Sequence, residues 1–394
     1  MNGLPWLAIV RLGIVQMSLG AIFVLMTSVV NRIIAVELAL PALLTGGLLA
    51  VHYVMQLMRP HFGHGSDTGG SRTPWIIGGM FVLAIGGTLA AAATWLLSIH
   101  TSAGIALAVT AFVLIGAGVG ASGTSLLVLI AAKVAPSRRA AAACITWVMM
   151  IGGFIVTTVI AGELLTPFSM QRMFWLIAGI CLGAFVLATI AVGRIEYRYA
   201  NVPDASVNAE TQVPFMTALR EVLAERETRL FALFVGISMF AYGAQDLVLE
   251  PFAGAVFGMG VADSTKLSAA HHQGVLIGMI AIGALGSRYI GALRHGAVFG
   301  CLASAVCLAG LVASAARTEF WPLQLNVMLM GLANGIFAVA AIGSMMNLVN
   351  QGAEGRQGVR MGIWGAAQAI AMGTGTIMGT AMVDLTRLLS HDLQ

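Results

Sequence analysis

The chain has 394 residues, of which 59% are hydrophobic and only 9% are Asp, Glu, Lys or Arg, and its formal net charge is +4. A soluble domain carries about 25% charged residues, so this chain has too few charges to cover a surface that faces water. The composition therefore excludes soluble enzymes, nucleic-acid binders and secreted disulfide scaffolds. It predicts an all-α membrane protein with many spans.

A transmembrane helix needs about 20 consecutive apolar residues. Eleven segments meet this need, at residues 9–31, 41–58, 75–98, 103–132, 140–162, 173–193, 230–250, 268–290, 296–315, 322–348 and 360–383. The long polar stretch follows the sixth span. We therefore expect an N-terminal six-helix bundle at 1–193, a central cytoplasmic loop at 194–229, and a C-terminal bundle at 230–394 with five visible spans and its twelfth span missing.

The basic residues predict the orientation in the membrane, because Lys and Arg collect on the cytoplasmic side. With the N-terminus inside, 15 of the 20 Lys and Arg residues fall on that side. We therefore expect a multi-pass protein whose N-terminus is cytoplasmic.

The two halves of the chain resemble each other. Residues 36–41 after the first span are echoed by residues 248–251 after the seventh, and Trp147 and Trp364 follow Arg138 and Arg356 at nearly equal distances. Parallel repeats of this kind are typical of the major facilitator superfamily. The sequence thus predicts two pseudo-repeated helix bundles with that fold.

The loop after the second span supports the same fold. Gly63, Asp67, Gly70 and Arg72 have the spacing of the major facilitator signature between spans 2 and 3. The glycines permit a tight turn, and Asp67 can accept hydrogen bonds at the N-terminus of a neighbouring helix. This motif indicates a structural or gating role and says almost nothing about a substrate.

Charged and polar residues also lie where spans 1 and 7 end. They are Arg32 with Glu37 after span 1, and Gln245 and Asp246 with Glu250 after span 7. Charges this close to a bilayer usually pair with each other. We interpret them as a structural brace between the two halves, with a surface that docks a partner protein as the alternative.

The spans contain few other polar residues. Spans 3, 4, 6, 9 and 10 have no Asp, Glu, Lys or Arg in their apolar interiors, and the remaining ionisable groups lie near span ends. A proton-coupled transporter usually needs acidic or histidine relays at mid-membrane, and the sequence shows no convincing relay. This pattern favours an apolar ligand.

Several blocks resemble the PucC/LhaA group, the bacteriochlorophyll delivery branch of the major facilitator superfamily. The matching blocks are residues 31–32, 36–42, 52–53, 59–60, 62–63, 65–67, 72–80, 245–251 and 362–369. The short length and the segment 271–276 are most similar to the member encoded with pigment-synthesis genes.

This resemblance implies a non-enzymatic assembly factor of phototrophic bacteria. Such a protein would deliver bacteriochlorophyll or chlorophyll, with carotenoid or lipid as further cargo, to light-harvesting or reaction-centre complexes. The implied partners are antenna polypeptides, the reaction-centre complex or a pigment synthase, together with membrane lipids and without nucleic acid. The implied location is the bacterial inner (intracytoplasmic photosynthetic) membrane.

Six residues are candidates for binding the pigment: His52, His272, Trp147, Trp364, Gln368 and Asn347. A neutral imidazole of His52 or His272 can ligate a pigment magnesium, although a hydrogen bond to a neighbouring helix explains a histidine in a span equally simply. Trp75, Trp147 and Trp364 can stack on a flat macrocycle, or mark the membrane interface. Catalytic residues and a direct metal site are not expected.

Two other functions remain open from the sequence. One is a non-transporting scaffold for a pigment synthase or nascent antenna polypeptides. The other is a secondary transporter of a lipophilic solute, against which the absence of a buried relay argues.

Overall fold

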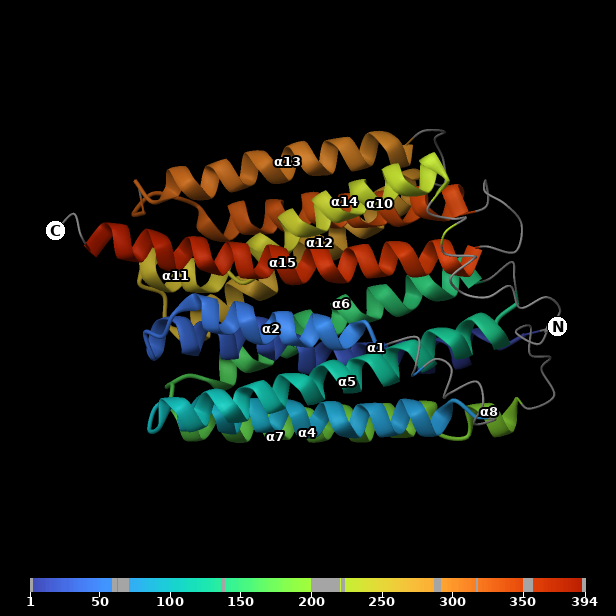
Figure 1. The fold of residues 1–394 in the computed structure, drawn as a ribbon, viewed down its shortest axis with the longest axis horizontal. Helices are drawn as coiled ribbons and strands as arrows, with labels where there is room; N and C mark the ends of the chain where they lie inside the picture. Colours follow the sequence, from blue (N-terminus) through green and yellow to red (C-terminus); the bar gives the residue numbers. More distant parts are fainter. Residues whose placement is uncertain are drawn as a thin grey trace.

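The computed structural model describes residues 3–58, 62, 71–135, 139–199, 220, 224–286, 292–316, 318–349 and 357–391. Every long element in these ranges is a helix, and the helices lie side by side along the longest axis of the molecule (Figure 1). A helix satisfies all its backbone hydrogen bonds internally, as a bilayer requires. The prediction of an all-α protein is confirmed.

Among the described residues, the first half of the chain contains six long helical segments and the second half five. Those of the first half are α1 (Trp6–Leu25) with its extensions η1 (Met26–Val30) and η2 (Ile33–Glu37), α2 (Ala42–Gln56), α4 (Thr73–Leu97), α5 (Thr101–Lys133), α6 (Arg139–Leu164) and α7 (Met170–Val192). The short helix α8 (Ile195–Arg198) follows α7, after Arg194 adopts a left-handed conformation with φ of 61°. That residue breaks the long helix and lets α8 turn away.

The second half adds five long helical segments. They are α10 (Arg226–Asp246) with the short α11 (Leu249–Phe257), α12 (Val261–Gly286), α13 (Ala292–Ser314), α14 (Leu323–Val349) and α15 (Gln357–His391). In Figure 1 the helices of this half occupy the upper part of the molecule, and those of the first half the lower part. The predicted pair of helix bundles is therefore present. The exact division at 194–229 stays a prediction, since most of that segment lies outside the described residues.

Eight of the described helices are long and apolar enough to cross a membrane, and α2 is a shorter apolar helix. Each of the eleven predicted spans coincides with one helical segment. Two helix pairs, α2 with α15 and α6 with α12, pack across the two halves. Small residues let helices approach closely, as transmembrane bundles require. At Gly79 on α4, for example, a Cβ atom would lie 2.9 Å from the Gly118 carbonyl oxygen of α5.

The two ends of the bundle are distinct. We call the end where η2 finishes and α2 begins the Arg32 end, and the end where α1 begins the Trp6 end. In Figure 1 the helix α11 marks the Arg32 end on the left, and α8 marks the Trp6 end on the right. Arg11 on α1 donates to the Gly193 carbonyl oxygen at 2.9 Å, which ties α1 to the end of α7 at the Trp6 end.

Candidate functional site

Polar side chains join the two halves at the Arg32 end. Glu250 on α11 is buried, and its Oε1 atom accepts a hydrogen bond from the Ser28 hydroxyl of η1. Asn31 donates to the Leu247 carbonyl oxygen at 2.8 Å. Because these contacts link residues more than 200 positions apart, they hold the end of the first span against the turn between α10 and α11.

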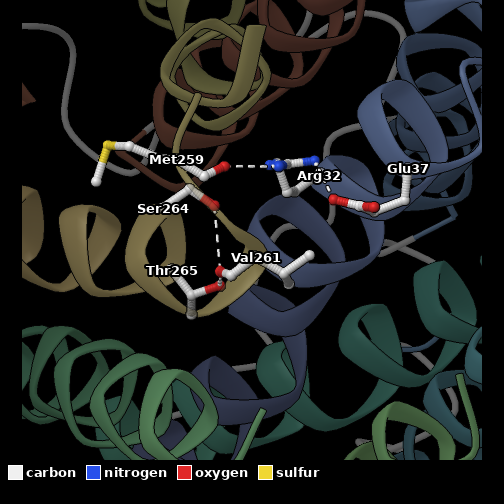
Figure 2. A network of polar contacts seen from close by, with 6 residues as sticks. All are labelled: Arg32, Glu37, Met259, Val261, Ser264 and Thr265. Atoms are coloured by element: carbon white, nitrogen blue, oxygen red, sulfur yellow. Dashed lines mark hydrogen bonds and ion pairs between the residues drawn. The ribbon is translucent and has the colours of Figure 1, made fainter. Parts of the chain in front are cut away.

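Arg32 is the charged centre of this contact and is only 2% exposed. Its guanidinium donates to the Met259 carbonyl oxygen at 2.8 Å and pairs with Glu37 at 3.1 Å, and Figure 2 shows it lying between the two. Gly254 leaves room for it, since a Cβ atom there would lie 2.7 Å from the guanidinium carbon. The contacts are those that a brace between the halves needs, while the role itself stays a prediction.

Two further contacts cross between the halves at the same end. The Asp384 carboxylate of α15 accepts from the backbone N–H groups of Ala42 and Leu43, each at 2.7 Å, where α2 begins. A carboxylate at a helix N-terminus satisfies free N–H groups and opposes the positive end of the helix dipole. Lys266 of α12 pairs with Glu163 of α6 at 2.9 Å, and both side chains are partly exposed.

A small cavity with polar walls lies behind the brace, with a volume of about 20 Å³. We call it the polar cavity; its lining residues are Thr27, Tyr242, Gln245, Asp246, Leu249, Glu250, Ser268, His271, His272 and Met330. That volume suits one water-sized occupant. Sequence reasoning missed this cluster, because it placed the acids and the histidines separately, near the ends of two different spans.

Both histidines of α12 have defined environments. His272 Nδ1 lies 2.8 Å from the Ser268 carbonyl oxygen, so Nδ1 carries the proton and Nε2 keeps its lone pair. Its ring packs edge-on against Phe154 of α6, with centroids 4.9 Å apart. His271 Nε2 lies 3.4 Å from the amide nitrogen of Asn334 on α14. Both imidazoles therefore contact neighbouring helices.

His52 on α2 lies near the same aromatic group. Its Nε2 atom is 3.1 Å from the amide nitrogen of Gln56, and its ring centroid is 5.1 Å from that of Phe23. Phe23 in turn lies 6.4 Å from Phe154, which contacts His272. The structure thus brings His52 and His272 to opposite sides of one phenylalanine pair. Both are buried, so a macrocycle reaches neither imidazole in this arrangement.

The other predicted site residues do not join this group. Trp147 on α6 and Gln368 on α15 are exposed and line neither the polar cavity nor the groove described below. The side chains of Asn347 and Trp364 lie outside the described residues, as do Gly63, Asp67 and Gly70 of the loop motif. Arg72, the last residue of that motif, is buried at the start of α4.

Glu196 on α8 binds the N-terminus of α4. Its carboxylate accepts from the Ser71 hydroxyl at 2.6 Å, from the Arg72 backbone N–H at 3.0 Å and from the Thr73 backbone N–H at 2.6 Å. The sequence analysis expected Asp67 to accept hydrogen bonds at a neighbouring helix N-terminus. Asp67 lies outside the described residues, so that expectation stays a prediction, and Glu196 is the carboxylate that the structure shows at the N-terminus of α4.

The larger concave feature lies between α4 and α5 and has a volume of about 350 Å³. We call it the apolar groove; its lining residues are Phe62, Pro74, Trp75, Gly78, Gly79, Val82, Ala117, Gly118 and Ala121. This volume is in the usual range of small-molecule sites, which are mostly apolar. A Cβ atom on Gly78 would meet no other atom within 4 Å, so the floor of the groove is open there. In the sequence, only Trp75 signalled this groove.

Comparisons with known proteins agree with the sequence pattern. A family model described as PUCC protein matches residues 29–393. The bacteriochlorophyll synthase 44.5 kDa chain of Rhodobacter capsulatus is 49% identical over 390 residues, which cover 99% of this chain and 90% of that protein. Protein PucC of Cereibacter sphaeroides is 28% identical over 384 residues, covering 94% of this chain and 82% of that protein.

Solved transporter structures share the fold. The xylose transporter XylE from E. coli, in a partially occluded inward-open conformation, has a TM-score of 0.70 at 13% identity, covering 95% of this chain and 91% of that one. The nucleoside transporter NupG has a TM-score of 0.67 at 12% identity, covering 96% and 91%. At these identities the likeness shows the fold alone. The predicted major facilitator fold is confirmed.

Proposed function

This chain belongs to the PUCC protein family, and from that premise we propose that it is a bacteriochlorophyll- or chlorophyll-handling assembly factor. It would deliver the pigment to light-harvesting or reaction-centre complexes, or assist their assembly. A relative whose name refers to bacteriochlorophyll supports this interpretation. The transporter-like fold favours a carrier over an enzyme, although one relative is named as a synthase chain.

The apolar groove is the observation that carries the proposal. A chlorin macrocycle is flat and largely apolar, and the groove is open at Gly78, where a Cβ atom would meet no other atom within 4 Å. Trp75 provides an aromatic face against which such a ring can stack. The described lining residues include no Asp, Glu, Lys or Arg, so an apolar cargo would remove no charged group of theirs from water.

The groove also has a consequence for the pigment's magnesium. Among the described residues no histidine lines the groove, and we assign no protein ligand to the pigment's magnesium there. A second position, with the free Nε2 of His272 as the ligand, would require the two halves to separate around Phe154. We propose the groove as the site for the macrocycle because it is open without any separation of the two halves.

We further propose that the Trp6 end faces the cytoplasm in the bacterial inner (intracytoplasmic photosynthetic) membrane. Arg11, Lys133, Arg194 and Arg198 all belong to helix ends on that side, as the positive-inside rule requires. Antenna polypeptides, the reaction-centre complex or a pigment synthase are the proposed partners, and the membrane lipids surround the spans.

The absorption spectrum of the protein, purified in mild detergent from a phototrophic host, tests the proposal. We expect one bound pigment per chain, and we expect Trp75→Ala to remove most of it. Trp175 on α7 is 64% exposed, so Trp175→Ala is the matched control and keeps the pigment. A colourless wild-type protein that still co-purifies with a synthase or an antenna polypeptide would replace the carrier by a scaffold.

A secondary transporter of a lipophilic solute is the second candidate function. The sequence showed no convincing proton relay at mid-membrane, which disfavours a transporter. The polar cavity, however, brings two carboxyl groups and two imidazoles together. Counterflow in proteoliposomes, with free pigment as the solute, tests this function. Exchange across the membrane would support it, and binding without exchange would leave the carrier.

A further inference from the structure

We propose that the polar cavity binds one small monovalent cation, either a proton or a sodium ion. This inference is independent of the pigment, because the polar cavity lies between the halves whereas the apolar groove lies within the first half. It rests on the charge around the cavity, on one carboxylate oxygen, and on the size and chemistry of the lining.

The charges around the polar cavity are out of balance. Asp246 and Glu250 both line it, whereas no described Lys or Arg does. Arg32 is the positive charge that faces Glu250, but it already pairs with Glu37 at 3.1 Å. Two carboxyl groups therefore line a buried cavity, and the guanidinium that faces one of them is already paired; an unbalanced charge inside a membrane protein is costly. One bound cation reduces that excess.

One oxygen atom is left for the cation. Glu250 is only 3% exposed, and its Oε1 atom accepts from Ser28. Its Oε2 atom is buried and accepts no hydrogen bond of normal geometry among the described residues, with the Ser264 and Ser268 hydroxyls as the nearest donors. The nearby Ser264 hydroxyl donates instead to the Val261 carbonyl oxygen at 3.1 Å, as Figure 2 shows. A buried carboxylate oxygen without a donor normally has an ion or a water beside it.

The remaining walls suit a hard cation of small size. Thr27, Gln245 and Ser268 bring further side-chain oxygen atoms to the cavity, and its volume of about 20 Å³ admits one water-sized occupant. Oxygen ligands favour alkali and alkaline-earth ions over softer metals. In the part of the chain that the structure describes, no three His, Cys, Asp or Glu side chains are arranged to hold a metal ion, which disfavours a transition metal.

The occupant would be influenced by groups from every element around the cavity. The ionisable groups are Arg32 and Glu37 from the first half, Tyr242 and Asp246 from α10, Glu250 from α11, and His271 and His272 from α12. Helix α14 contributes Met330, which does not titrate. Because the cavity lies where Thr27 and Ser28 of the first half meet Glu250 of the second, a bound cation would strengthen the contact between the halves.

The test uses the full chain in lipid nanodiscs and two direct measurements. The first is binding of radioactive sodium ions, with choline as the competitor that keeps ionic strength constant. The second is the infrared band of a protonated carboxyl group, recorded at neutral pH. Asp246→Asn is the principal variant, and Asp263→Asn is its control, because Asp263 is an exposed acid on α12 that does not line the cavity.

We expect saturable binding of one sodium ion per chain, weakened at least about tenfold in Asp246→Asn, as loss of a charged ligand implies, and unchanged in the control. Without sodium binding, a carboxyl band that Asp246→Asn or Glu250→Gln abolishes assigns the site to a proton. The proposal is overturned if the wild type shows neither signal, or if Asp246→Asn behaves like the wild type. If Asp246→Asn does not fold, Ser268→Ala replaces it as the variant expected to weaken binding. A wild type that shows neither signal overturns the proposal whichever variant is used.

Discussion

The apolar groove and the polar cavity differ in nearly every physical property. The groove has a volume of about 350 Å³, lies between α4 and α5 of one half, and is lined almost entirely by carbon. The cavity has a volume of about 20 Å³, lies where the two halves meet, and is lined by carboxyl, imidazole and hydroxyl groups. One suits a large flat apolar molecule, and the other suits a single ion or water.

This difference shows how the chain separates two physical tasks. A charged group beside an apolar cargo would lose its hydration when the cargo binds, so the groove excludes such groups. The junction between the halves needs specific pairing, which apolar contacts do not give in a lipid environment, and it therefore contains the buried polar side chains. Variants that fill the apolar groove or remove polar groups from the junction test whether the two regions have separate roles.

The largest expected effect comes from removing the charge that holds the junction. Arg32→Leu leaves Glu37 without its partner and the Met259 carbonyl oxygen without its donor. Glu37 is 36% exposed, so water offsets part of the lost pair, and the loss of a charged donor to a carbonyl oxygen costs about 1.5–3 kcal/mol. The midpoint of thermal unfolding in detergent measures the loss. In contrast Arg172 is exposed, and Arg172→Leu is expected to change stability by less than about 0.5 kcal/mol. Equal midpoints for the two variants would show that the junction does not depend on Arg32.

The next effect comes from filling the groove. Gly78→Leu places a side chain where a Cβ atom would meet nothing within 4 Å, so it occupies the groove without displacing a helix. We expect bound pigment per folded chain to fall at least about tenfold, equivalent to 1.4 kcal/mol. Gly179 on α7 is equally open, and Gly179→Leu is the control that keeps the pigment. Full pigment content in Gly78→Leu would remove the groove as the binding site.

A smaller effect is expected at the N-terminus of α4, one of the two helices that line the apolar groove. Glu196→Gln keeps the shape of the side chain but removes the negative charge that faces the N-terminus of α4. Loss of such a cap costs about 1 kcal/mol. Thermal unfolding measures it, with Glu319→Gln as the control, because Glu319 is exposed. Unfolding midpoints that agree within error would mean that α8 does not support α4.

The sequence predicted the helices well, because a bilayer-length apolar run leaves the backbone no other regular structure. It also placed Arg32 and Glu37 close together, since both lie in one short segment. It did not predict the polar cavity, whose acids and histidines belong to α10, α11 and α12 and meet only through the turns between these helices. The groove was hidden apart from Trp75, because its shape depends on how closely α4 approaches α5.

The smallest expected effect separates the two regions most directly. His272 lines the polar cavity between the halves, whereas the groove lies between two helices of the first half. Distant sites usually act independently to within about 0.5 kcal/mol, so His272→Ala and His52→Ala should each leave bound pigment within about a factor of two. The absorption spectrum per folded chain measures this. A spectral shift with pigment loss in either variant would instead make that imidazole the magnesium ligand, as the sequence alone suggested. The pigment would then bind between the two halves, and the proposed cation site beside His272 would be part of the pigment site.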